Sequence, residues 1–172
     1  VTSNPGDAIA QVAGPQVGAA VRGMLEARGI AYRPEHQVKA VDGAARRIEF
    51  THGVLADYDL LLYVPPHRAP AVVREAGLTN EAGWIPVDRH TLQTKFEQVF
   101  AIGDITTIPL KMGRPLPKAG VFAHGQAETV AANIAHAWTG RGAPRRFDGY
   151  GMCFIEAGSG RLRKHPVCHT ED

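Results

Sequence analysis

One apolar run and the helix that follows it constrain the fold of this chain most strongly. Val99–Ile102 is continuously apolar, which predicts a strand buried on both faces, and it ends at Gly103-Asp104. After a loop rich in Pro and Gly, residues 120–138 carry apolar side chains at helical spacing and predict the longest helix. Gly140 lies just past the predicted helix, and helices commonly end at a glycine. A buried strand that leads into a helix indicates an α/β fold.

Shorter elements precede this pair. Apolar residues at helical spacing predict a helix over residues 15–28. Three β-like runs, at 37–41, 46–50 and 54–57, predict a small antiparallel meander, because Asp42-Gly43 is a typical hairpin turn.

Three further elements complete the pattern. Leu60–Val64 predicts a second strand buried on both faces, which Pro65-Pro66 ends. Residues 69–76 predict a short helix and residues 84–87 a short strand. We therefore expect a mostly parallel sheet with an inserted antiparallel meander.

Composition excludes several classes of protein. The 172 residues include 19 Lys and Arg against 17 Asp and Glu, so the net charge of +2 points to no nucleic-acid or membrane partner. No apolar run approaches the roughly 18 residues that a transmembrane segment needs. Two cysteines, Cys153 and Cys168, are too few for a disulfide scaffold, and a reducing cytoplasm is the expected compartment.

Asp104 is the first candidate binding residue. In open α/β sheets, ligands bind outside the carboxyl ends of the strands, and Asp104 follows such an end. Gly103 lacks a side chain and lets a ligand approach the backbone. A carboxylate accepts two hydrogen bonds, which suits neighbouring hydroxyls of a sugar or sugar alcohol. The alternative is that Asp104 only caps the loop or helix after the strand.

Pro117-Lys118-Ala119-Gly120 forms the second candidate site, at the start of the long helix. The first turn of a helix presents unpaired N–H groups and a partial positive charge, and Lys118 adds a full charge. Such a site favours an anion or an electron-rich carbonyl. Together with Asp104 it suits a polyol joined to a ring that gains negative charge. The alternative is that Lys118 is an ordinary solvated lysine.

These segments resemble a known family. Three parts of the chain, Thr94, Val99–Asp104 and Pro117–Ala123, resemble the second flavin-binding motif of the pyridine nucleotide-disulfide oxidoreductases, nearest to the branch of sulfide:quinone oxidoreductases and flavocytochrome c sulfide dehydrogenases. The alternative for Thr94 is a structural role. Tyr58–Leu61, Val64–Arg68 and Gly149–Glu156 resemble the same branch. The resemblance covers roughly residues 1–160.

The resemblance implies an FAD-dependent oxidoreductase with a partial FAD/NAD(P)-binding, Rossmann-like fold. Asp104 would bind the ribityl hydroxyls of FAD, and Gly103 would let the chain pass near the cofactor. Lys118, with Pro117, Ala119 and Gly120, would face the pyrimidine side of the flavin and stabilise its reduced form. The implied reaction carries two electrons through flavin, from a sulfide or an NAD(P)H-type donor to an acceptor such as a quinone.

The chain also departs from the family pattern. It has no G-x-G-x-x-G turn for the adenosine pyrophosphate, so we expect the N-terminal half of the family fold to be missing. The expected domains are residues 1–64, a remnant of the nucleotide-binding middle domain with the meander, residues 65–160, the C-terminal part of the FAD-binding domain, and a polar tail at 161–172. The alternative is a truncated, non-catalytic remnant or interaction domain without flavin, which self-associates or pairs with a chain that supplies the missing half.

Cysteine and histidine residues near the C-terminus are candidates for redox chemistry and for metal binding. In the sulfide-oxidising branch a cysteine at the position of Cys153 pairs with an upstream cysteine, which makes Cys153 the candidate redox residue. That upstream partner is absent here, and the alternative is that Cys153 is a small buried hydrophobe. His165, Cys168 and His169 lack a fourth ligand nearby, and no metal site is expected.

Overall fold

A computed structural model describes residues 14–111, 113–156 and 162–166, with only the backbone described for 153–156 and 162–166. The chain divides into two compact units. The first contains the described residues up to Pro65, with Glu156 and Leu162. The second contains Pro66–Ile155 and the described residues after Leu162. The last two strands, β6 (Met152–Glu156) and β7 (Leu162–Pro166), form a two-stranded sheet.

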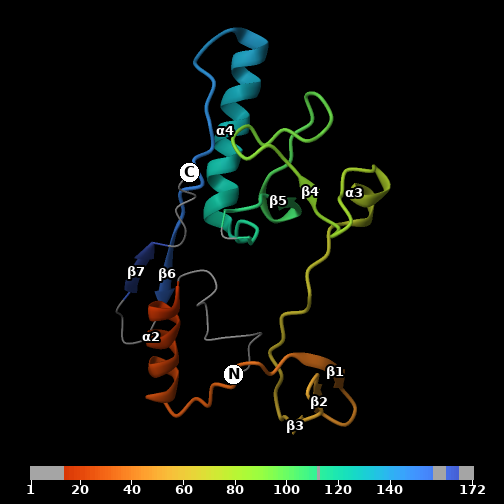
Figure 1. Ribbon diagram of the computed structural model, residues 1–172, viewed down its shortest axis with the longest axis vertical. Coiled ribbons are helices and arrows are strands. Elements are labelled where there is room, and N and C mark those ends of the chain that lie inside the picture. The colour runs from red at the N-terminus through yellow and green to blue at the C-terminus, as the bar shows by residue number, and fades with distance from the viewer. Residues whose placement is uncertain (1–13, 112, 157–161, 167–172) are drawn as a thin grey trace. The chain divides into compact units, whose positions relative to one another are not determined.

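Helix α2 (Pro15–Glu26) is the first element in the described part of the first unit (Figure 1). Pro15 occupies the first helical turn, where its missing N–H costs no hydrogen bond. Gly29, with a φ of 71°, follows the end of the helix. The predicted helix over 15–28 is therefore confirmed, with an end two residues earlier.

The antiparallel meander is confirmed as β1 (Val38–Asp42), β2 (Arg47–Phe50) and β3 (Leu55–Asp57). β2 lies in the middle and pairs antiparallel with both neighbours, Val41 opposite Ile48 and Ile48 opposite Ala56. The Asp42 carboxylate accepts the N–H of Ala45 at 2.8 Å and stabilises the first turn. Ile48 and Phe50 are buried, so the meander has one apolar face.

The prediction of a buried strand at Leu60–Val64 is wrong. The structure has no strand there, and Leu60, Leu62 and Val64 are 78%, 89% and 76% exposed. No other strand in the described part of the chain pairs with this run, so its side chains have no sheet to pack against. A continuous apolar run indicates only that a segment can be buried, because burial on both faces also requires flanking strands.

The second unit contains α3 (Ala71–Glu75), β4 (Ile85–Pro86), the 3-10 turn η1 (Gly103–Ile105), β5 (Thr106–Thr107) and α4 (Gly120–Thr139). These elements confirm the predicted helices near 69–76 and 120–138 and the strand near 84–87, which is shorter than expected. β4 and β5 pair in parallel, with Ile85 opposite Thr106. α4 ends at Gly140, whose φ is 67° and whose N–H bonds to the carbonyl of His136 at 2.8 Å.

The predicted buried strand at Val99–Ile102 is also wrong. Phe100 makes an isolated antiparallel bridge with Gln93, and Val99 and Ile102 are each 38% exposed. Gln98 just before the run has a φ of 60°, so the chain turns sharply into it and back along its own preceding segment. The described residues thus contain both parallel and antiparallel pairing, and the mostly parallel sheet is not observed, because the one parallel pair recorded is the short β4–β5.

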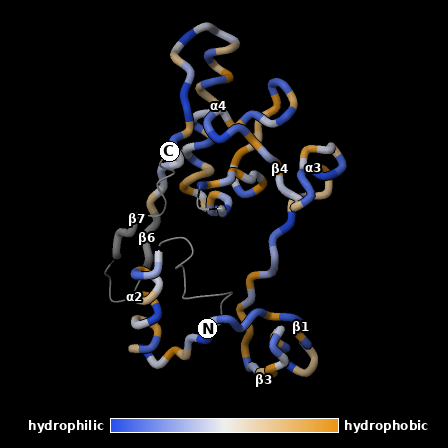
Figure 2. The backbone as a smooth tube through the Cα atoms, viewed as in Figure 1, coloured by the Kyte–Doolittle hydropathy of each residue, from blue (hydrophilic) through white to orange (hydrophobic). Residues whose placement is uncertain are grey.

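A compact core holds the second unit together. Its buried members are Leu92, Ile108, Leu116, Phe122 and Phe147. Burying a Leu or Phe side chain contributes about 1.5–3 kcal/mol. Hydrophobic residues recur along α4 and the segments beside it (Figure 2). Since Phe122 and Leu116 flank residues 117–121, the core fixes the start of α4, which is the part of the helix that the sequence singles out.

Candidate functional site

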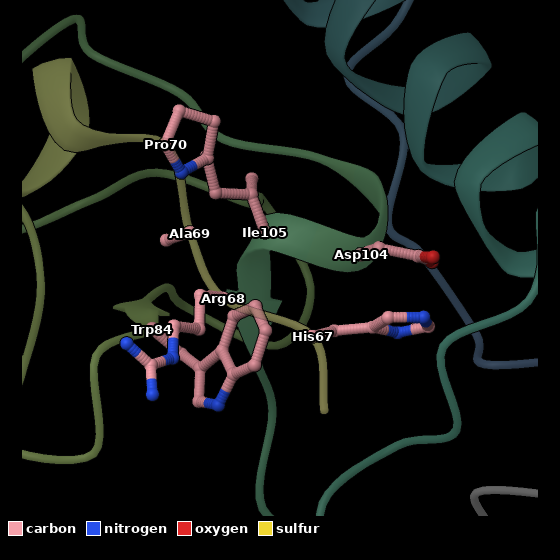
Figure 3. Close-up of a pocket in the computed structure, with 7 residues that line it drawn as sticks. All are labelled: His67, Arg68, Ala69, Pro70, Trp84, Asp104 and Ile105. Carbon is pink, nitrogen blue, oxygen red and sulfur yellow. The ribbon is translucent and has the colours of Figure 1, made fainter. Parts of the chain in front are cut away.

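A pocket of about 290 Å³ opens beside η1 in the second unit. In Figure 3 the Asp104 carboxylate and the His67 imidazole extend to the same side of this pocket. Apolar and aromatic surface comes from Ala69, Trp84 and Ile105. The complete lining consists of His67, Arg68, Ala69, Pro70, Trp84, Asp104 and Ile105. A concave site with a few polar groups among apolar ones is typical of small-molecule binding.

The turn that carries Asp104 is fixed directly to α4. Gly103 has a φ of 73°, and its N–H donates to Oε1 of Gln126 at 2.6 Å. Its carbonyl accepts the hydroxyl of Thr106 at 2.8 Å. A Cβ at Gly103 would lie 3.4 Å from the Cβ of Ala123. The glycine therefore permits both the left-handed backbone and the close approach of the turn to the helix.

The Asp104 carboxylate remains available to a ligand. Asp104 is exposed, and among the described residues no hydrogen bond to its carboxylate oxygens is found. η1 has no side-chain cap, so the capping role that was the alternative for Asp104 is not observed. An ionised carboxylate only accepts hydrogen bonds, so this side chain can receive hydroxyl or N–H donors.

Lys118 lies directly beside this turn. Its ammonium donates to the backbone carbonyl of Asp104 and to that of Thr106, the latter at 3.1 Å. It also lies 3.4 Å from the ring centroid of Trp84, a cation–π arrangement. Partial burial lowers the pKa of Lys118 below its ordinary value of 10.5, and the nearby charge of Asp104 opposes that shift. Lys118 is thus not an ordinary solvated lysine.

The start of α4 is open. Ala119 is the N-cap, in an extended conformation, and it provides no side-chain cap. Its carbonyl accepts the N–H groups of Phe122 and Ala123 at 3.0 and 3.2 Å. The first turn contains no acidic residue, so no side chain there neutralises the positive end of the helix dipole. The N–H groups of Gly120 and Val121 belong to the orphan donors of a helix start.

The structure brings together the sequence-predicted residues Gly103, Asp104 and Pro117–Gly120. Lys118 joins the two segments through its bond to Asp104, and Gly103 packs on α4. Sequence reasoning missed Trp84 and Gln126. Gln126 is 1% exposed and lies four residues from both Phe122 and Val130, so a polar residue within the apolar stripe of the helix was the available signal. Trp84 gave no comparable signal, because its contact with Lys118 is tertiary.

The remaining candidate residues from the sequence are not among the described residues that line this pocket. Thr94 is buried, and its hydroxyl accepts the N–H of Phe96 at 3.1 Å, which is a local structural role. Cys153 lies in β6, and its side chain is outside the described part of the structure. Cys168, His169 and the side chain of His165 are likewise outside it. Within the described residues, no cluster of three His, Cys, Asp or Glu side chains is placed to hold a metal ion.

In the described part of the chain, no helix is both long enough and apolar enough to cross a membrane.

Comparison with known proteins agrees with the resemblance seen in the sequence. The sequence profile of the pyridine nucleotide-disulphide oxidoreductase family matches residues 4–137. The mitochondrial sulfide:quinone oxidoreductase of Mus musculus is 29% identical over 106 residues, which are 61% of this chain and 22% of the mouse protein. That of Schizosaccharomyces pombe is 29% identical over 141 residues, or 78% of this chain and 29% of the yeast protein. The chain thus spans less than a third of either relative.

Solved structures show the same fold. The sulfide:quinone oxidoreductase from Aquifex aeolicus has a TM-score of 0.73 at 19% identity, covering 95% of this chain and 44% of that one. A FAD-dependent pyridine nucleotide-disulphide oxidoreductase from Desulfovibrio vulgaris has a TM-score of 0.61 at 22% identity, covering 90% of this chain and 40% of that one.

Proposed function

This chain belongs to the pyridine nucleotide-disulphide oxidoreductase family, and we propose that it forms the flavin-ring half of an FAD-dependent oxidoreductase. One observation carries the proposal. The turn that presents the unbonded carboxylate of Asp104 is joined to the uncapped start of α4 through Lys118, which donates to the backbone carbonyl of Asp104. This donor and acceptor set fits the ribityl chain and the pyrimidine edge of FAD, because a polyol offers hydroxyl donors and a reduced flavin ring offers an electron-rich edge. Bound FAD would supply the two-electron redox chemistry.

Asp104 would bind the ribityl hydroxyls in this proposal. Hydrogen bonds to a charged group contribute about 1.5–3 kcal/mol each. The carboxylate needs no rearrangement to accept them, since the described residues leave its oxygens without a hydrogen bond. Asp104 is therefore the residue on which cofactor affinity would depend most strongly.

The start of α4 would face the electron-rich edge of the flavin ring. A helix N-terminus stabilises a nearby negative charge by about 0.3–1 kcal/mol at exposed sites. Lys118 adds a full positive charge beside it. Pro117, Ala119 and Gly120 carry small or donor-free side chains that leave room for a planar ring. Both charges would favour the reduced over the oxidised flavin and raise its reduction potential.

The reaction is the second part of the proposal. We propose a sulfide or an NAD(P)H-type compound as electron donor and a quinone as a suitable acceptor, because two relatives are named sulfide:quinone oxidoreductases. Cys153 is the proposed redox cysteine. The residues that bind the adenosine half of FAD, and the cysteine that pairs with Cys153, would be supplied by another part of the protein or by a partner chain. The cytoplasm remains the expected compartment.

A second candidate function is an interaction domain that does not bind flavin. It is favoured by the exposed apolar run of Leu60, Leu62 and Val64, since exposed contiguous apolar surface is typical of binding surfaces. Sedimentation distinguishes this candidate, because self-association through the run would depend on protein concentration and would be lost in a Leu62→Asp variant.

Thermal unfolding with three ligands tests the main proposal. We expect FAD and riboflavin to raise the Tm, because both contain the ribityl chain and the flavin ring, and ADP to leave it unchanged. The shift should be lost in Asp104→Ala and kept in Asp59→Ala, which removes an exposed carboxylate of the first unit. An absent shift with FAD, or an unchanged shift in Asp104→Ala, would contradict the proposal.

A further inference from the structure

One ammonium group connects three separate segments of the second unit. Lys118 precedes α4, and its Nζ lies over Trp84, the residue just before β4. The same Nζ donates to the carbonyl of Asp104 in η1 and to that of Thr106, the first residue of β5. We call Lys118, the Trp84 ring and these two carbonyls the Lys118 clamp.

The clamp binds the backbone of Asp104 and leaves its carboxylate free. A lysine beside a carboxylate commonly pairs with it, yet the hydrogen bonds of Lys118 go to two carbonyl oxygens. A cation–π contact with the Trp84 ring stabilises the ammonium in this position, since the face of an indole attracts a cation. The result is a turn fixed at two carbonyls, with its charged side chain lining the pocket.

A second lysine of the same unit shows that stacking alone does not make such a clamp. The Nζ of Lys95 lies 5.2 Å from the ring centroid of the adjacent residue Phe96. That contact joins two neighbours in sequence and connects no separate segments. Lys95 is therefore a matched control for the loss of a ring-stacked lysine.

We propose that Lys118 is a positioning residue, which acts on ligand binding by holding the turn that presents Asp104, with Trp84 as the second part of the device. The identity of the ligand rests on the proposed flavin function, whereas the clamp itself does not. Without Trp84, the ammonium loses its cation–π contact and can pair with the Asp104 carboxylate. Trp84 therefore also keeps that carboxylate free to bind the ligand. Trp84→Leu therefore weakens binding although it removes no hydrogen-bonding partner of the ligand.

Hydrogen exchange of the full chain without ligand tests the clamp. The amides of residues 103–106 should exchange faster in Lys118→Met than in the parent, because the turn loses two fixed carbonyls. Lys118→Arg should restore slow exchange, since a guanidinium also donates hydrogen bonds and stacks on aromatic rings. Lys95→Met should match the parent. Parent-like exchange in Lys118→Met, or equal acceleration in Lys95→Met, would overturn the proposal.

A double-mutant cycle on FAD affinity tests whether Lys118 acts through Asp104. The cycle uses oxidised FAD, whose ring carries no negative charge for Lys118 to stabilise. Lys118→Met should raise the Kd of oxidised FAD roughly tenfold in the parent, the loss expected for a hydrogen-bonded charge, and leave the Kd of Asp104→Ala unchanged. Losses that add in the double variant would mean that Lys118 contacts the cofactor directly, and would overturn the positioning role. If the parent binds no FAD, the proposed function fails, while the exchange experiment still decides the clamp. If Lys118→Met does not fold, Trp84→Leu takes its place in the exchange experiment, which is carried out without ligand.

Discussion

The backbone N–H of Gly103 donates to the side-chain oxygen of Gln126 at 2.6 Å, which ties the turn of Asp104 to the buried stripe of α4. Gln126 is 1% exposed, so this bond lies where water does not replace it. Leaving a buried donor or acceptor unpaired costs more than an average hydrogen bond contributes. The position of Asp104 therefore depends on the core of the second unit as well as on its own turn.

Gln126→Leu keeps the approximate shape of the side chain and removes the acceptor for Gly103. We expect the free energy of unfolding to fall by about 1–3 kcal/mol, because the N–H of Gly103 loses its partner. Urea unfolding followed by circular dichroism measures the change. Gln16→Leu, at an exposed position of α2, is the control and should change stability little. A stability of Gln126→Leu equal to that of the parent would show that the bond does not anchor the turn.

Gly151→Ala tests how tightly the core encloses Phe122. A Cβ at Gly151 would lie 2.3 Å from Cε1 of Phe122, a ring that is 1% exposed. We expect a loss of about 1–3 kcal/mol in the free energy of unfolding, since overpacking forces a core ring to move. Gly43→Ala provides the comparison, because a Cβ there meets no atom within 4 Å. Equal effects of the two substitutions in urea unfolding would contradict the packing described here.

Asp88 makes stability depend on pH. Its carboxylate accepts hydrogen bonds from the N–H and the hydroxyl of Thr91 and from the N–H of His90. These bonds, led by that from the Thr91 N–H, lower the pKa of Asp88 below its ordinary value of 3.8. The stabilisation is therefore complete above 3.8 and is lost as the pH falls through the lower pKa of the folded state.

Asp88→Asn removes this titration. We expect the variant to be less stable than the parent at neutral pH, and the difference to shrink as the pH falls below 3.8. Urea unfolding at a series of pH values measures both curves. Glu81→Gln removes another exposed carboxylate of the unit and serves as the control. A difference between parent and Asp88→Asn that is constant across pH would refute the assigned role.

Elements specified by local signals could be predicted from the sequence. α4 has apolar residues at helical spacing and a glycine at its end, and the meander has an Asp-Gly turn between alternating runs. The two predicted buried strands failed for a common reason. Leu60–Val64 and Val99–Ile102 are apolar enough to be buried, but a strand also needs neighbours, and the sequence of the run does not specify them.

The candidate site could be predicted only in part, because its residue types are local signals but their contacts are tertiary. Asp104 and Lys118 stand in recognisable motifs, so their residue types could be identified. That Lys118 binds a carbonyl of Asp104, and rests on Trp84, depends on how three segments meet in space. The role of Gln126 likewise depends on the packing of η1 against α4.

The most direct test of the account is a titration of this chain with FAD, followed by flavin fluorescence, in the parent and in Asp104→Asn. The account expects saturable binding in the parent and a Kd at least roughly tenfold higher in Asp104→Asn, since the neutral amide loses charge-assisted hydrogen bonds to the ribityl hydroxyls. An unchanged Kd in Asp104→Asn, or no saturable binding by the parent, would contradict it.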